Sequence, residues 1–250
     1  MSNFYADDNS TSAVSGGTVY CTKTYGSGIL SISGGTVDHA TACRTSMLSI
    51  SGGNVDEIVA SESSTLVISG GNVSQISASD SSNVGIFNGA VSTLIAEGST
   101  TAKIVGGVVG NLGVRNCNTA TVSGGEVEYL YAQDSSAVSI YAGKVDNLEV
   151  NSSNIDIFGG NVKKLLANEA SAIILHGYDF QAKGGLTLHG NSVLGTGTLM
   201  GRWFGRDDSL WSMSISSNNN AAKITLVPEP STLLLLSGGF LAMLKRRLRQ

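Results

Sequence analysis

The pentapeptide Ser69-Gly70-Gly71-Asn72-Val73 recurs in near-copies at a fixed spacing through the first two thirds of the chain. A fixed short period indicates stacked, nearly identical units that each contact only their neighbours. We therefore expect nine coils of about 18 residues each between residues 10 and 167. The second glycine marks the phase, and its copies are evenly spaced except that the last comes one residue early: Gly17, Gly35, Gly53, Gly71, Gly89, Gly107, Gly125, Gly143 and Gly160.

Five columns of apolar residues keep the same phase from coil to coil. Before the marker glycine, one column is always β-branched and a second, two residues earlier, is mostly apolar, as in Ile86 and Val84. After the glycine come a valine and two further apolar positions, as in Val91, Leu94 and Ala96. A spacing of two indicates a strand with alternate residues inward, whereas a spacing of three requires a bend. The sequence predicts an all-β fold, a parallel β-solenoid.

The Gly-Gly pair predicts a tight corner in every coil. A bend stacked on identical bends needs a positive φ or a close backbone approach that a Cβ would obstruct. Asn88 and Ala142 replace the first glycine in two copies, so we expect the second glycine to be the stricter requirement.

These repeats resemble the short-coil repeats of bacterial autotransporter-like and adhesin-like surface proteins, in which Ser-Gly-Gly-x-Val units also recur. The left-handed hexapeptide helix has coils of the same length. However, it places one aliphatic residue at every sixth position, and this sequence does not.

The remaining positions of each coil are mostly Ser, Thr, Asn and Asp, and we interpret them as a solvent-facing outer turn. Such side chains commonly satisfy one another and the backbone at turns. A binding face for ice or glycans is the alternative, and the lack of a regular Thr-x-Thr pattern counts against ice. One hydroxyl column contains Ser27, Thr45, Ser63, Ser81, Ser99, Ser135 and Ser153. Its neighbour contains Ser46, Ser64, Ser82, Thr100, Asn118 and Ser136.

Charge and metal-ligand patterns exclude several functions. The net charge is −4 and the repeats carry no basic stripe, so we expect no nucleic-acid partner. The acidic column is interrupted, and no calcium-repeat pattern is present, so we expect no metal. We interpret the three cysteines as small core-like residues, because an odd count argues against a disulfide framework. The acidic column contains Asp38, Asp56, Glu128 and Asp146, and the three cysteines are Cys21, Cys43 and Cys117.

No catalytic motif is recognisable. His39, His176 and His189 have no Ser, Cys or acidic partner at motif spacing, and no nucleophile elbow, zinc-protease motif or phosphate loop occurs. We expect a protein that is not an enzyme and needs no cofactor. A secreted carbohydrate-active β-helix enzyme, a lyase or hydrolase, remains the alternative, and it would need two carboxylates in reach of each other on one face.

Two further segments frame the repeats. Residues 1–9 form an N-terminal tail without the basic start and apolar run of a secretory signal peptide, so we expect either a longer natural chain or another route of export. Residues 168–227 contain both tryptophans, and we interpret them as a β-rich module that caps the open end of the rod. Its expected strands are 172–176, 186–189, 197–204, 209–215 and 223–227.

Residues 228–250 combine a Pro-Glu-Pro tripeptide, a short apolar segment and a basic end, an order that resembles the PEP-CTERM sorting signal. The apolar run from Leu233 to Leu244 predicts a short hydrophobic helix with a cytoplasmic basic end. The module before the tail also resembles one that precedes this signal in exported proteins. The motif residues are Pro228, Glu229, Pro230, Ser231 and Thr232, and the basic stop comprises Lys245, Arg246, Arg247 and Arg249.

The resemblance implies export by a Gram-negative bacterium, transient anchoring in the inner membrane and processing by an exosortase-type membrane enzyme. Combined with the repeats, it predicts a non-catalytic structural or adhesive rod of the cell surface or exopolysaccharide matrix. Exopolysaccharide or a surface glycan is the partner we expect for such a rod.

Overall fold

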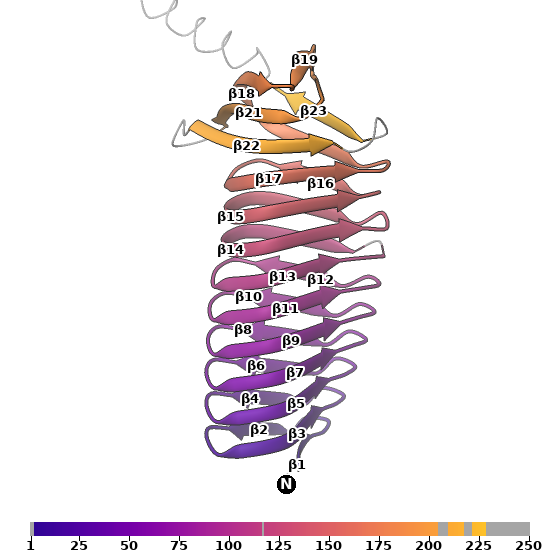
Figure 1. Ribbon diagram of the computed structural model, residues 1–250. Helices are drawn as coiled ribbons and strands as arrows, with labels where there is room; N and C mark the ends of the chain where they lie inside the picture. The colour runs from indigo at the N-terminus through magenta and orange to yellow at the C-terminus, as the bar shows by residue number, and fades with distance from the viewer. Residues whose placement is uncertain (1–2, 117, 205–209, 218–221, 229–250) are drawn as a thin grey trace, which may run out of the picture.

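The computed structural model of the chain describes residues 3–116, 118–204, 210–217 and 222–228. These residues form one 23-stranded sheet that winds into a rod, with the N-terminus at one end (Figure 1). All strand pairs between successive coils of the repeats are parallel, as in Ile86 against Ile68 and Ile104. Their register is regular except near the glycine corner between the two longest strands, where it shifts around Ser123. The predicted parallel β-solenoid is confirmed, and it has about 10 coils where nine were expected.

Each coil consists of a short strand, the Gly-Gly corner and a longer strand. The short strands, four residues each, are β2 (Thr11–Val14), β4 (Ile29–Ile32), β6 (Met47–Ile50), β8 (Thr65–Ile68), β10 (Asn83–Ile86), β12 (Thr101–Ile104) and β16 (Asn154–Ile157). The longer strands are β3 (Thr18–Thr24), β5 (Thr36–Ala42), β7 (Asn54–Ala60), β9 (Asn72–Ala78), β11 (Ala90–Ala96), β13 (Val108–Val114) and β17 (Asn161–Asn168). In two coils the pair is continuous, as β14 (Thr119–Gln133) and β15 (Ala137–Asn151), and β1 (Asn3–Ala6) lies beneath β3.

The five apolar columns are buried, as predicted. In the coil of β10 and β11, Val84, Ile86, Val91, Leu94 and Ala96 are each no more than 2% exposed. The expected bend falls inside the longer strand, where two outward residues separate Val91 from Leu94. Side chains of this size contribute about 1.5–3 kcal/mol each when fully buried, so the columns hold the coils together.

One prediction for the outer turn is wrong. The column that includes Ser82 lies inside the rod, where its members are no more than 1% exposed: Ser46, Ser64, Ser82, Thr100, Asn118, Ser136, Ser153 and Ser171. Several of these hydroxyls donate to backbone carbonyls, either at the end of the longer strand in the coil below, as Ser136 does to Val114 at 3.1 Å, or within the turn, as Thr100 does to Glu97 at 2.7 Å. A hydrogen bond removes most of the cost of burying a hydroxyl.

The outer position predicted for Ser153 is also wrong. The coil that ends at the last marker glycine is one residue shorter than the others, and the residue is missing before Ser153. Ala137 pairs with Asn154, so the missing residue belongs to the turn that precedes Asn154. Ser153 therefore stacks in the buried column, and Ser152 takes the outer position.

Each coil has a residue with positive φ at two corners, and the two corners differ in the residue types that they accept. The outer turn holds φ values near 60° with many kinds of side chain, such as Glu62 at 60° and Asp80 at 60°. The second glycine of the marker has larger values, such as 83° at Gly71, where a Cβ would lie 2.8 Å from the carbonyl oxygen of Gly53. The outer turn tolerates L-residues because its φ values fall within the left-handed region that they can adopt, whereas the glycine corner also lacks room for a Cβ.

The rod continues beyond the last marker glycine. The C-terminal strands are β18 (Ala172–Gly184), β19 (Thr187–His189), β20 (Ser192–Leu194), β21 (Gly197–Trp203), β22 (Leu210–Ser217) and β23 (Lys223–Val227). The first residues of β18 stack on β16, β22 stacks on β17, and β23 stacks on β18, all in parallel. Between them, β21 pairs antiparallel with β18 and β22, so it covers the end of the stack (Figure 1).

The five strands expected in this module correspond to β18, β19, β21, β22 and β23, whereas β20 was missed. The C-terminal helix expected from Leu233 to Leu244 lies outside the described residues. Within the ranges that the structure describes, no helix has the length and apolar character needed to cross a membrane.

Candidate functional site

The sorting tail leaves the rod directly from its last strand. In β23, Leu226 is 3% exposed and Val227 pairs with His176 of β18. Pro228 follows at the surface, where its missing N–H ends the ladder of backbone hydrogen bonds. The tail therefore starts where the packed fold stops. The other expected motif residues, Glu229, Pro230, Ser231 and Thr232, and the basic stop, Lys245, Arg246, Arg247 and Arg249, lie outside the described residues.

A groove runs across the outward face of the longer strands, and we name it the tyrosine groove. It consists of two adjoining hollows of about 430 and 250 Å³ that share Tyr129 and Glu149. The first hollow is lined by Thr93, Ile95, Asn111, Leu112, Gly113, Arg115, Tyr129, Tyr131 and Glu149. The second extends towards the cap over Asn147, Leu148, Lys164, Leu165, Leu166, Ser214 and Ser216.

Strand alternation positions these side chains. In the longer strands two outward positions flank each inward Leu or Ile, and stacking places equivalent positions of successive coils above one another. Gly113 pairs with Ile95 of β11 on one side and Tyr131 of β14 on the other. Because Gly113 has no side chain, the column has a gap there, and this gap forms the first hollow.

Hydrogen bonds hold the acidic side of the groove in place. The Tyr129 hydroxyl donates to Glu149 Oε2, and Asn151 Nδ2 donates to Glu149 Oε1 at 3.3 Å. The bond to Glu149, together with partial burial and the nearby negative charge, raises the pKa of Tyr129 to about 12. On the other side, Arg115 Nη1 lies 3.6 Å from Glu97 Oε1. The groove thus offers aromatic surface, a fixed carboxylate and a cation within one site.

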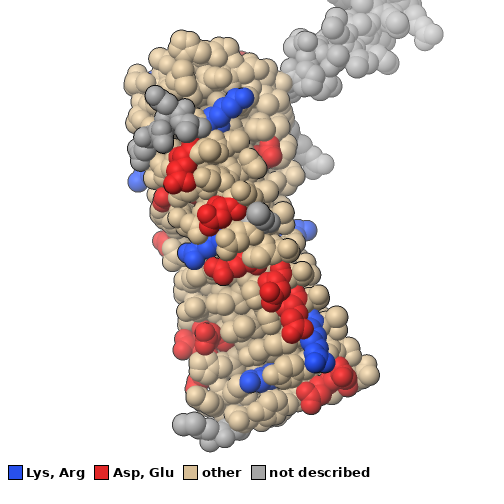
Figure 2. All heavy atoms as spheres, turned by 90° about the vertical axis from the view of Figure 1, so that its right-hand side faces the viewer, with Lys and Arg blue, Asp and Glu red and all other residues tan. Residues whose placement is uncertain are grey.

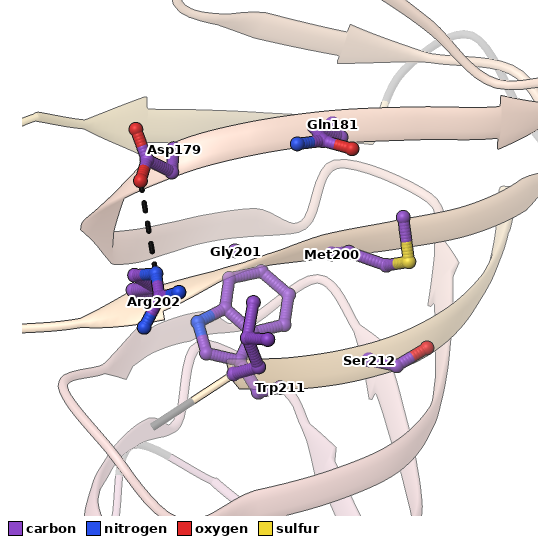
Figure 3. A pocket seen from close by; sticks show the side chains of 8 residues that line it. Asp179, Gln181, Met200, Gly201, Arg202, Trp211 and Ser212 are labelled. Atoms are coloured by element: carbon purple, nitrogen blue, oxygen red, sulfur yellow. Dashed lines mark ion pairs between the residues drawn. The ribbon is translucent and has the colours of Figure 1, made fainter. Parts of the chain in front are cut away.

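A second pocket, of about 490 Å³, lies in the cap (Figure 3). Asp179 and Gln181 come from β18, Met200 and Arg202 from β21, and Trp211 and Ser212 from β22, and the figure shows these three strands side by side. Arg202 Nε lies 3.7 Å from Asp179 Oδ2.

The cap tryptophans are largely packing residues. Trp211 stacks on Trp203 at a ring distance of 4.5 Å, and both are 7% exposed. Trp203 Nε1 donates to the carbonyl of Gly160 at 2.8 Å, which ties β21 to the last glycine corner. The two tryptophans therefore belong to the packed core of the cap.

Two histidines have acidic partners that the sequence analysis missed. His39 Nδ1 lies 2.9 Å from Glu57 Oε2, and His176 Nε2 lies 3.1 Å from Asp156 Oδ1. Each pair joins neighbouring coils. A search at the repeat spacing would have found His39 and Glu57, which are 18 residues apart, but not His176 and Asp156, which are 20 residues apart. His189 lies exposed in β19. His176 also stacks on Phe158 at 4.0 Å, so this pair belongs to an aromatic ladder on the surface.

Charged side chains are scattered along the rod. Figure 2 shows them on the side formed by the outer turns, where uncharged surface predominates. In the acidic column, Asp146 lies 2.7 Å from Lys163 and 3.3 Å from Lys144, which also contacts Glu126. Lys163 and then Lys144 lower the pKa of Asp146, and the Glu126 and Asp146 carboxylates raise the pKa of Lys144. Among the described residues, no three His, Cys, Asp or Glu side chains cluster as metal ligands would.

The tyrosine groove itself was not predicted from the sequence. The sequence analysis considered the hydroxyl columns of the outer turn as the candidate binding face, whereas the groove lies on the flat face beside that turn. The available signal was the pair of outward columns in the longer strands, in which Tyr129 and Tyr131 appear one coil after Asn111 and Gly113.

Comparison with known proteins identifies the tail. Residues 226–250 match the family model described as the PEP-CTERM protein-sorting motif. The predicted sorting motif is therefore confirmed, and it implies an exported protein that an exosortase processes. No curated protein and no solved structure matches the chain.

Proposed function

We propose that this protein is a non-catalytic β-solenoid of the cell surface or exopolysaccharide matrix, where it acts as a structural or adhesive rod. The observation that carries the proposal is the position of the sorting motif, which begins at Leu226 and Val227 within the last strand of the rod. Cleavage just beyond that strand would leave the stacked coils and their cap intact.

The tail then acts as a sorting signal that is removed after export. In a Gram-negative host, the apolar segment would anchor the chain transiently in the inner membrane, with the basic residues after Leu244 kept in the cytoplasm. An exosortase-type enzyme would cut near Pro228 and release the rod to the surface or the matrix.

The rod supports a mechanical or adhesive role because of its length and regularity. About 10 coils at the strand spacing of ~4.8 Å give a stack of roughly 50 Å. A chain with 14% charged residues and many hydroxyl and amide side chains suits a hydrated polysaccharide environment.

The alternative is a secreted carbohydrate-active enzyme on a β-helix. Glycoside hydrolysis commonly needs two carboxyl groups across the scissile bond. The tyrosine groove is lined by one carboxylate, Glu149, and the cap pocket by one, Asp179, which is paired with Arg202. The proposal therefore favours binding over cleavage.

Cell fractionation in an exosortase-positive host and in an otherwise identical exosortase-deficient strain tests the proposal. We expect the protein in the surface or matrix fraction of the first strain and in the membrane fraction of the second. Matrix polysaccharide incubated with the released protein should keep its chain length. Release of reducing ends, absent from a Glu149→Gln variant, would instead establish the enzyme.

A further inference from the structure

We propose that the tyrosine groove is a binding site for a neutral oligosaccharide, with one sugar ring held in the hollow over Gly113. The inference deepens the adhesive role and rests on the proposed function. It names a site and a ligand class for that role.

The shape of the hollow follows from a single missing side chain. Ile95 and Tyr131 lie one coil to either side of Gly113, so their backbones are about two strand spacings, ~10 Å, apart. A Cβ built on Gly113 would find its nearest neighbour, Ile95 Cγ1, at 3.8 Å, an ordinary contact distance. The gap is therefore accessible space above the sheet, bounded by an aliphatic and an aromatic side chain.

The walls of the hollow match the two kinds of surface on a sugar. Apolar and aromatic lining with a few placed polar groups is typical of ligand sites, and the C–H face of a pyranose packs against such a wall. The ring hydroxyls both donate and accept hydrogen bonds. They can meet acceptor-only Glu149, donor-only Arg115, and Asn111 and Thr93, which do both.

The polar groups of the groove are held before any ligand binds. Glu149 accepts from Tyr129 and from Asn151, which fixes the direction of its carboxylate. Arg115 is restrained by Glu97, and its Nε lies 3.9 Å from the Cβ position of Gly113. Groups that are already ordered lose less conformational entropy on binding.

Charge and topology favour a neutral sugar over other occupants. Of the charged residues that line the first hollow, Arg115 is paired with Glu97 and the other is the carboxylate Glu149, so the position of the sugar ring offers no unpaired cation to a polyanion such as a polyuronate. Lys164 lines only the second hollow. An extended peptide binds most readily by adding to an open sheet edge. The floor strands β11, β13, β14 and β15 each have a parallel neighbour on both sides, so no edge is open there.

Filling the hollow tests the site without damaging the fold. Gly113→Val adds a β-branched side chain to an outward strand position that has room for it, so the melting temperature should be unchanged or higher. Ser77→Val places the same side chain in the same column two coils earlier, outside the groove. Tyr131→Ala removes the aromatic wall.

The full-length chain in detergent would be titrated by calorimetry with hexamers of β-1,4-linked glucose and mannose, and with a galacturonate hexamer. We expect the native chain and Ser77→Val to bind at least one neutral hexamer equally. Gly113→Val and Tyr131→Ala should weaken binding by about tenfold or more, the loss typical of truncating or blocking an interface anchor.

Four results would overturn the inference. They are no binding of a neutral hexamer by the native chain, unchanged binding by Gly113→Val, preferential binding of the galacturonate hexamer, or a dimer in sedimentation that Gly113→Val abolishes. None of them affects the surface localisation measured by cell fractionation, so failure of the groove is distinguishable from failure of the proposed function.

Discussion

The most informative perturbation is an alanine at two equivalent corners, Gly71 and Gly17. Both glycines have a positive φ, 83° and 75° respectively. At Gly71 a Cβ would lie 2.8 Å from the carbonyl oxygen of Gly53 and 2.9 Å from the carbonyl carbon of Gly52, whereas at Gly17 nothing lies within 4 Å. The difference arises because Gly17 belongs to the first glycine corner and has no corner beneath it.

The magnitudes separate the two contributions to the corner. Gly17→Ala should cost only the left-handed backbone penalty, about 1–2 kcal/mol. Gly71→Ala adds the cost of forcing two coils apart, about 1–3 kcal/mol. For a chain of this size, 1 kcal/mol corresponds to about 2–4 °C in melting temperature. Thermal melts should therefore place Gly71→Ala roughly 2–12 °C below Gly17→Ala, and equal melts for the two variants would refute the close stacking of the corners.

Other substitutions probe the corner, the core and the tyrosine hydrogen bond. Gly71→Val should lower the melting temperature more than Asn72→Val, because a β-branched residue suits the strand at Asn72 and not the corner; the reverse order would contradict the corner. Ile86→Asp should make the central coils sensitive to protease, since Ile86 is 0% exposed and an unpaired buried charge is costly, whereas Ser81→Asp in the exposed turn should leave the coils resistant. The pKa of Tyr129 is raised from its ordinary value of 10.0 to about 12. The hydrogen bond of its hydroxyl therefore stabilises the fold fully below pH 10, and this contribution is lost as the pH rises through about 12. Tyr129→Phe should remove the tyrosine absorbance step near pH 12.

The repeat architecture was predictable because every coil packs in the same way, so the same residue types recur at the same positions. Ile86 alone is one apolar residue, but its column is β-branched in every coil, and the spacing of two to Val84 identifies a strand. The spacing of three between Val91 and Leu94 correctly placed a bend. Errors at single positions average out over such a series.

The buried hydroxyl column was misassigned because residue type and burial disagree there. Ser136 is polar, yet it faces inward because backbone carbonyls of Val114 and Gln133 accept its hydrogen bond. Sequence patterns record the polarity of a side chain and not its partner.

The groove and the cap were harder to predict for a different reason. Gly113 and Tyr131 are recognisable as parts of one site only when the register of neighbouring coils is known. The stacking of β22 on β17 depends on contacts between segments far apart in the chain, as the pairing of Leu165 with Ile215 shows. Local patterns do not encode pairings of that range.

The central claim is that the rod is an exported protein whose tail is removed just beyond its last strand. Mass spectrometry of protein recovered from the surface or matrix of an exosortase-positive host tests this claim most directly. We predict peptides that end between Pro228 and Thr232, and none that begin at Leu233 or later. Intact C-termini containing Leu248 in that fraction would contradict the account and leave a permanent membrane anchor in its place.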